Sequence, residues 1–184
     1  MRQSAKLGII CMVIGLSILG GTLYRSNSPN GFGYGTIDFF PIPAHSWGAD
    51  NGTDTISARY FWPPRDMRME IQSNATIDVY ILDAEGVNLW QSERTLKPLW
   101  AFQNVTHQVF TKEVPNRGEY VILIYNPTEA SAGFEINSTI YGFEKDLIIL
   151  SLIFSLSGLA FIVATLIQVL KLGGNKKWKK EVKK

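Results

Sequence analysis

Two long stretches of uncharged, mostly apolar residues dominate the pattern, and both predict membrane-spanning helices. The longer one, residues 145–170, is uncharged throughout Leu147–Leu170. As a helix these twenty-four residues measure about 36 Å, against about 30 Å for the hydrocarbon core of a bilayer. A buried core helix is the weaker interpretation, because a domain this small could not cover such a helix on all sides.

The other apolar stretch, residues 7–24, fits either a short membrane helix (or signal anchor) or a cleavable signal peptide. Arg2 and Lys6 precede it, as they would in both cases. Cleavage requires small residues at the −3 and −1 positions, and only a cut after Thr22, with Gly20 at −3, approaches this requirement. We therefore favour a retained helix.

Residues 36–144 show the period-two alternation of β-strands, broken by turn residues. Met67, Met69 and Ile71 alternate with polar residues, and after a turn at residues 73–75 the alternation resumes over residues 77–81, which predicts a hairpin. Residues 83–86 predict a second turn before a short strand at 87–90. We find no segment with a convincing helical period here.

The second half of this region predicts another hairpin and a final strand. Residues 106–113 lead through a turn at 115–118 into 120–125, the most continuous apolar run and so a central strand. Alternate residues from Phe134 to Ile140 share one face of the last strand, and Asn137 lies on the other. With weaker strands at 36–40 and 55–62, the pattern predicts an all-β sandwich, jelly-roll-like, of about seven to eight antiparallel strands between two transmembrane α-helices.

Charge orients these parts. Residues 26–144 contain seven basic and fourteen acidic side chains, a formal charge of −7, whereas the tail 171–184 has seven Lys and one Glu, and residues 1–6 are also basic. Positive charge concentrates in short cytoplasmic segments, so both termini are expected in the cytoplasm, with the sandwich outside at the plasma membrane. A Gly-rich linker, residues 25–35, precedes the sandwich. This layout disfavours a soluble enzyme and a nucleic-acid binder.

Candidate modification sites are consistent with an extracytoplasmic domain. Four Asn-X-Ser/Thr sequons predict a glycoprotein: Asn51, Asn74, Asn104 and Asn137. The one cysteine, Cys11, belongs to the first apolar stretch. No intramolecular disulfide can therefore brace the domain.

No motif predicts catalysis or cofactor binding. His45 and His107 are the two histidines, and neither has the ligand spacing of a metal site. Oxygen-bearing residues alternate in Asp50–Asp54, as in calcium loops, but the remaining ligands are missing and a turn explains them better. We also find no Gly-X-Ser-X-Gly nucleophile motif. We expect no enzymatic activity and no cofactor.

Aromatic and small residues are the candidates for binding. The domain is rich in aromatic residues, which either fill the core or form a surface platform for a sugar or a protein. Candidate binding aromatics are Trp47, Trp62 and Trp100, two of which lie near prolines typical of exposed loops. Small residues form one face of each apolar stretch and are candidates for helix packing: Gly8, Gly15, Ser151, Ser155 and Gly158.

Residues 67–170 resemble the GOLD-domain (emp24-like) cargo-adaptor family and the jelly-roll modules of prokaryotic surface proteins. The similar features are the strand and turn IDVYILDAEG, the strand NRGEYVILIYNP, a final amphipathic strand and a membrane helix. The chain departs from the emp24 pattern in lacking a cysteine pair in the domain and a coiled coil, and in having Val182 where a dilysine signal needs Lys. A prokaryotic membrane-anchored interaction module fits these departures better.

Together these features predict a non-catalytic, membrane-anchored accessory or adaptor protein. Its expected partners are the lipid bilayer and either a membrane protein or a second copy of the chain. The alternative is a cell-surface carbohydrate-binding module that uses exposed aromatic side chains to bind a glycan.

Overall fold

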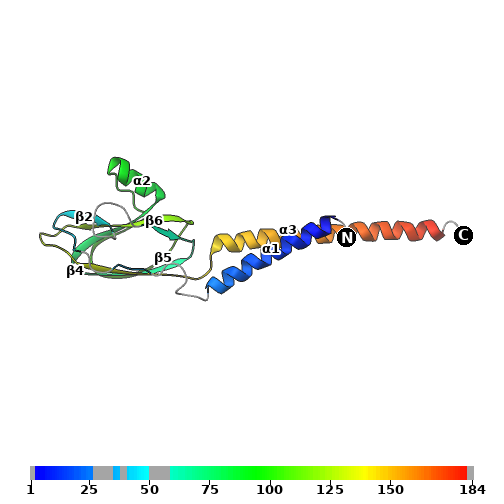
Figure 1. Cartoon of the computed structure of the whole chain (residues 1–184), viewed down its shortest axis with the longest axis horizontal. Coiled ribbons are helices and arrows are strands. Elements are labelled where there is room, and N and C mark those ends of the chain that lie inside the picture. Colours follow the sequence, from blue (N-terminus) through cyan, green and yellow to red (C-terminus); the bar gives the residue numbers. More distant parts are fainter. Residues whose placement is uncertain (1–2, 27–34, 38–40, 50–58, 182–184) are drawn as a thin grey trace. The chain divides into compact units, whose positions relative to one another are not determined.

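The computed structural model of the chain describes residues 3–26, 35–37, 41–49 and 59–181; the side chains of residues 35–37, 49 and 172–181 are outside this description. The chain divides into two units (Figure 1). One unit is the β-domain, residues 25–143, and the other pairs residues 1–24 with residues 144–184.

Antiparallel strands build the β-domain into one connected sheet. Its strands are β1 (Gly35–Ile37), β2 (Ser46–Ala49), β3 (Tyr60–Trp62), β4 (Asp66–Asp83), β5 (Trp100–Glu113), β6 (Gly118–Asn126) and β7 (Phe134–Tyr141). The strand order is β1-β7-β4-β6-β2, with β3 also paired to β6 and β5 paired to β4. The described residues thus form the antiparallel β-domain that the alternating pattern predicts.

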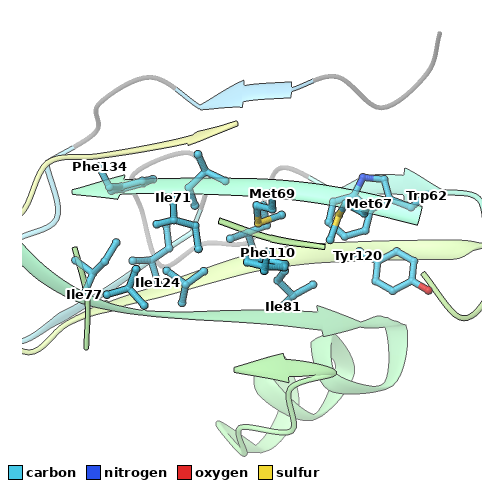
Figure 2. Close-up of a cluster of buried hydrophobic side chains, with 14 of the residues drawn as sticks. Trp62, Met67, Met69, Ile71, Ile77, Ile81, Phe110, Tyr120, Ile124 and Phe134 are labelled. Atoms are coloured by element: carbon cyan, nitrogen blue, oxygen red, sulfur yellow. The ribbon is translucent and has the colours of Figure 1, made fainter. Parts of the chain in front are cut away.

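Strand β4 organises the sheet because two different strands share one of its edges. Residues 66–73 pair with β7, residues 78–83 pair with β6, and β5 follows the other edge along both parts. Side chains from both parts of the sheet meet in one core, where Met69, Ile81 and Phe134 lie among the labelled residues of Figure 2.

Alternation explains which side chains enter this core. In β7 every second residue from Phe134 to Ile140 is buried, which confirms the predicted face. In β4 the large aliphatic side chains that face this core are fully buried: Met67, Met69, Ile71, Ile77, Val79 and Ile81. Burying each such side chain stabilises the fold by about 1.5–3 kcal/mol, so the core is the main source of the domain's stability.

The predicted hairpin at residues 67–81 is wrong, because β4 runs through the expected turn as a single strand of 18 residues. Ser73 and Asn74 do not reverse the chain there. The Ser73 hydroxyl and the backbone N–H of Asn74 both donate to the carbonyl of Gly133. In return, the backbone N–H of Gly133 donates to Oδ1 of the Asn74 side chain. The pairing with β5 is irregular between Gln72 and Ile77, so the extra residues form a bulge rather than a turn.

The second predicted hairpin is also wrong in its pairing, although both of its strands are present. Strands β5 and β6 each hydrogen-bond to β4 rather than to each other. The segment Val114–Arg117 therefore connects strands that are not neighbours in the sheet, while β6 lies between β4 and β2, the interior position expected of so apolar a strand.

A helix, α2 (Ala84–Glu93), replaces the predicted turn and short strand after β4. Asp83 is its N-cap and accepts a hydrogen bond at Oδ1 from the amide of Gly86. Val87 and Trp90, three residues apart, are buried on one face. Hydrophobic periodicity alone does not predict a helix that has only two apolar anchors.

The second unit consists of α1 (Gln3–Ser26) and α3 (Lys145–Glu181). Both are long and apolar enough to cross a membrane, α3 over Lys145–Lys171, as the hydrophobic pattern predicts. The helix α3 continues ten residues beyond that span, further than the predicted boundary at residue 170.

Candidate functional site

A shallow groove on the β-domain brings together two tryptophans, an arginine and a leucine. Trp47 comes from β2, Trp90 from α2, and Arg94 and Leu96 from the segment that follows α2. The groove has a volume of about 530 Å³. That size lies within the range of about 300–1,000 Å³ typical of small-ligand sites.

Helix α2 positions the groove by packing on the outer face of the sheet, over the side formed by β6 and β2 (Figure 1). Val87 and Trp90 are buried against Leu82, Val121 and Leu123, which form a second apolar cluster on the face opposite the main core. This cluster explains why β6 is apolar on both faces. It also fixes the Trp90 ring at the base of the groove.

The ring of Trp47 is held by aromatic neighbours on three sides. Its centroid lies 4.7 Å from that of Trp90, 4.8 Å from that of Tyr125 and 5.7 Å from that of Tyr80. The planes of Trp47 and Trp90 are inclined by 56°. Trp47 remains partly exposed whereas Trp90 is buried, so the two indoles form an angled corner in which the Trp47 ring is the part open to solvent, not a flat platform.

Arg94 ends α2 and places a cation at this corner. Its backbone is left-handed, with φ of 53°, and its amide donates to the carbonyls of Leu89 and Trp90. Its guanidinium carbon lies 5.4 Å from the Trp90 ring centroid, within cation–π range. A positive charge at a helix C-terminus is also favourable to the helix dipole. The backbone and the Trp90 ring together therefore orient the arginine.

The indole nitrogen of Trp90 is buried and has no hydrogen-bond partner among the described residues. The whole side chain is only 5% exposed. Buried indole N–H groups nearly always have an acceptor, so the missing partner is an unusual feature of this ring.

The other two predicted binding aromatics lie elsewhere. Trp62 is in the main core, 1% exposed and stacked on Tyr120 at 5.0 Å, so its assignment to an exposed platform is wrong. Its neighbours Pro63 and Pro64 are buried too, which is why the prolines were misleading. Trp100 begins β5 and packs partly buried against the same core.

Three of the sequons lie on the surface of the described domain. Asn74 and Asn104 are exposed, and Asn137 is half-buried on the outer face of β7. Asn104 has a left-handed backbone, with φ of 57°, and its amide donates to Asp78. Asn51 lies outside the described residues, as does the segment Asp50–Asp54 considered as a calcium loop.

The small residues of α1 and α3 face each other in an antiparallel helix pair. A methyl group added at Gly8 would lie 2.8 Å from the carbonyl oxygen of Gly158, and one added at Gly158 would lie 2.6 Å from that of Gly8. The backbones thus touch at this level. A hydrogen bond of 2.9 Å joins the hydroxyls of Ser4 and Thr165.

The same contact repeats one heptad further along α1. A methyl group at Gly15 would meet the Ser155 hydroxyl and lie 2.7 Å from the carbonyl oxygen of Ser151. The buried positions of α1 are Gly8, Gly15 and Thr22, seven residues apart. A seven-residue spacing keeps one face against the partner helix along a left-handed pair.

A second, smaller groove is lined by Asp83, Glu85, Glu119 and Arg117, but its carboxylates have structural partners. Asp83 caps α2, Glu85 pairs with Lys97 at 2.6 Å, and Glu119 pairs with Arg59 at 2.9 Å. The hydrogen bond that the Lys97 ammonium donates to Glu85 raises the pKa of Lys97 above its ordinary value. We assign no chemistry to this groove.

The histidines do not converge with other metal-binding side chains. Within the described residues no group of three or more His, Cys, Asp or Glu could hold a metal ion. His45 Nε2 lies 3.1 Å from Glu129 on the surface, and His107 is exposed on β5.

Comparison with known proteins identifies no family. No protein-family model and no curated protein matches the chain. Among solved structures, the chain is similar to the pre-peptidase C-terminal domain of a collagenase from Bacillus anthracis, at 10% identity and a TM-score of 0.31; the match covers 53% of this chain and 89% of that domain. A likeness this remote assigns no ligand to the groove.

Sequence reasoning found only Trp47 of the groove as a candidate site residue. Arg94 and Leu96 were missed because they follow a helix that was itself missed. One signal was present: Asp83, with Val87 and Trp90 three residues apart, marks a capped helix with one apolar face, and Arg94 follows its last turn.

Proposed function

We propose that this chain is a non-catalytic, membrane-anchored accessory or adaptor protein. In this proposal α1 and α3 cross the plasma membrane as a hairpin, and residues 36–144 form a jelly-roll-like β-sandwich outside the cytoplasm. Support for a sandwich comes from the single core to which both parts of the sheet contribute. The groove at Trp47 is the surface through which the domain binds its ligand.

The observation that most supports this proposal is the close pairing of α1 with α3. Glycines at their contact bring the two backbones together, as small residues do in membrane helix pairs. Away from that contact the helices expose large apolar side chains, among them Ile10, Val13, Ile153 and Leu156. Such surfaces are stable in lipid and unfavourable in water. The pairing also supports a retained α1 rather than a cleaved signal peptide.

Chain connectivity and charge support the orientation. Because the helices are antiparallel, the basic segments 1–6 and 171–184 leave the bilayer on one side, and the acidic residues between the helices leave on the other. This is the distribution that the positive-inside rule favours for cytoplasmic termini.

The orientation can be tested by labelling intact cells with a membrane-impermeant maleimide. Cys11→Ala provides a background without cysteine. In that background Thr111→Cys, exposed on β5, is expected to react, and Lys183→Cys is expected to react only after the cells are permeabilised. Labelling of Lys183→Cys in intact cells with a protected Thr111→Cys would overturn the proposal.

The adaptor role can be tested by purifying the full chain in lipid discs without a harsh detergent step. A membrane protein recovered in fixed stoichiometry, and lost on disrupting the helix pair with Gly15→Leu but retained with Gly20→Leu, supports the role. A lone, monodisperse chain counts against it. Gly20 is the matched control because its surroundings in the described structure are open.

A carbohydrate-binding module is the second candidate, favoured by the groove itself. Partly exposed Trp47, supported by Trp90 and flanked by Arg94, combines a ring face for the apolar side of a sugar with polar donors for its oxygens. The inclination of the two indoles suits one sugar ring in a corner better than a flat polysaccharide chain.

A further inference from the structure

We propose that the lysine-rich end of α3 bends at Gly173 and Gly174 and binds the anionic lipid headgroups of the membrane leaflet from which it emerges. This inference rests on the first proposed function, in which α3 crosses the membrane, and it specifies the lipid that the chain binds. Three features support it: a positive charge that the chain itself cannot neutralise, a glycine pair beside the membrane span, and a tryptophan among the lysines.

The tail, residues 171–184, carries more positive charge than its own side of the membrane can balance. It contains seven Lys and one Glu, a formal charge of +6. Fifteen of the sixteen acidic residues of the chain lie between residues 38 and 146, before the apolar span of α3. In the proposed topology the membrane separates them from the tail, and Glu181 is the single acidic side chain on the tail's side. Most of the countercharge must therefore come from outside the chain.

The membrane span holds these lysines close to the headgroups. Helix α3 continues without a break from Lys145 to Glu181, although its membrane span ends at Lys171 (Figure 1). At a rise of 1.5 Å per residue, Lys176 and Lys180 lie about 8 and about 14 Å beyond Lys171 along the helix. Attraction between charges decays over about 8 Å at physiological salt. An upright helix would leave Lys180 mostly beyond this range, whereas a helix bent toward the surface brings each lysine to where it contributes about 1 kcal/mol.

Gly173 and Gly174 give α3 a place to bend. They lie between the end of the span and the first lysine of the cluster 176–180. Glycine is less favourable than alanine inside a helix by about 1 kcal/mol per residue, because its backbone has more freedom to lose. The helix is therefore intrinsically weakest at this pair, and attraction to the surface has the least helical stability to overcome there.

Trp178 favours a membrane surface over an acidic protein as the partner. On a helix of 3.6 residues per turn, the neighbouring lysine positions fall within an arc of about 160°, and the position of Trp178 lies opposite the centre of that arc. These positions are Lys176, Lys177, Lys179 and Lys180. A helix with basic residues on one face and an aromatic residue on the other is typical of segments that lie in the membrane interface, where tryptophan is enriched.

The experiment measures which lipid lies beside Trp178, the one tryptophan outside the β-domain. The full chain is placed in lipid discs of phosphatidylcholine and phosphatidylserine in a fixed ratio. A fixed amount of brominated acyl chain, which quenches tryptophan fluorescence on contact, is carried by the serine lipid in one preparation and by the choline lipid in the other. Subtracting the quenching of Trp178→Phe isolates the tail. We expect quenching at Trp178 to show at least about threefold local enrichment of the serine lipid.

Variants separate the contributions of charge and bending. Changing the four lysines of the cluster 176–180 to Gln should abolish the preference for the serine lipid, whereas changing the same four to Arg, the matched control, should preserve it. Gly173→Ala combined with Gly174→Ala stiffens the helix and should reduce the preference; an unchanged preference would contradict the bend. Raising the salt concentration to about 1 M should also lower it, because screening then acts over about 3 Å. Circular dichroism checks that each variant is folded.

The possible failures are distinguishable. Equal quenching of Trp178 by both lipids, or by neither, in discs that contain the chain would overturn this inference and leave the proposed membrane anchorage standing. Failure of the chain to enter discs at all would overturn both. A polyglutamate peptide that displaces the serine lipid from the tail at physiological salt would identify an acidic protein as the partner and overturn the inference.

Discussion

The β-domain and the helix pair are held together in opposite ways. The core of the β-domain consists of large side chains such as Trp62, Met69 and Phe134, and its surface is polar and acidic. The contact between α1 and α3 consists of the smallest side chains, and the large apolar ones point outward. In water the burial of apolar area drives packing. In lipid, where we propose that the helix pair lies, it does not, and the close approach of the two backbones decides the pairing. The two interiors therefore respond to different substitutions.

The largest effect is expected from a cavity in the β-domain. Phe134→Ala removes a fully buried ring and should lower the free energy of unfolding by about 3–5 kcal/mol. Chemical denaturation followed by tryptophan fluorescence measures it. Val109→Ala, 42% exposed on β5, is the control and should change stability by less than about 0.5 kcal/mol. Equal losses would show that the core is not where the stability arises.

The helix pair should show the reverse sensitivity, to added rather than removed volume. Gly15→Leu forces the helices apart against Ser151 and Ser155, at a cost of about 1–3 kcal/mol. Gly20→Leu meets nothing and should be tolerated. Energy transfer between fluorophores on the two helices, measured in lipid discs, reports the separation. An unchanged signal for Gly15→Leu would contradict the packing described for α1 and α3.

A smaller effect is expected where α2 begins, on the outer face of the β-domain. Asp83→Ala removes the N-cap and should cost about 1 kcal/mol, whereas Asp83→Asn keeps an acceptor oxygen and should cost less. Because α2 positions Trp90 and Arg94, the alanine variant should also weaken ligand binding at the groove. Gln91→Ala, exposed on the same helix, serves as control for both measurements.

The smallest effect is a pH dependence confined to the β-domain. Burial raises the pKa of the Tyr120 phenol. The folded state therefore holds its proton to higher pH than the unfolded state, whose pKa is about 10, and the associated stability is complete below that value and is lost as pH rises above it. Unfolding free energies compared between about pH 9 and about pH 11 should fall less steeply in Tyr120→Phe than in the unaltered chain. An identical fall in unfolding free energy with pH in both proteins would exclude Tyr120 as a source of the pH dependence.

Local patterns in the sequence predict which helices and strands form better than they predict which strands pair with each other. Hydropathy alone predicts α1 and α3, and alternation alone predicts the buried face of β7. The expected turn at Ser73 and Asn74 fails because both residues bond to Gly133, about sixty positions away, and no local pattern contains that contact. The same limit explains the mistaken pairing of β5 with β6.

The groove was only partly predictable for the same reason. Trp47 stands out by its type, but its contact with Trp90 depends on β2 pairing with β6 and on α2 packing over that strand. The misplacement of Trp62 is different, since tryptophans beside prolines are found both in exposed loops and in cores. Only the packing against Tyr120 distinguishes the two.

The sharing of β4 between β6 and β7 also determines when the domain can fold during synthesis. Asp66 pairs with Tyr141 and Gly35 with Ser138, so the part of the sheet formed with β7 is incomplete until the last strand has been made. Contacts this distant in sequence slow folding. The next residues synthesised begin α3 at Lys145, so folding of the domain and synthesis of the second long helix are nearly simultaneous events.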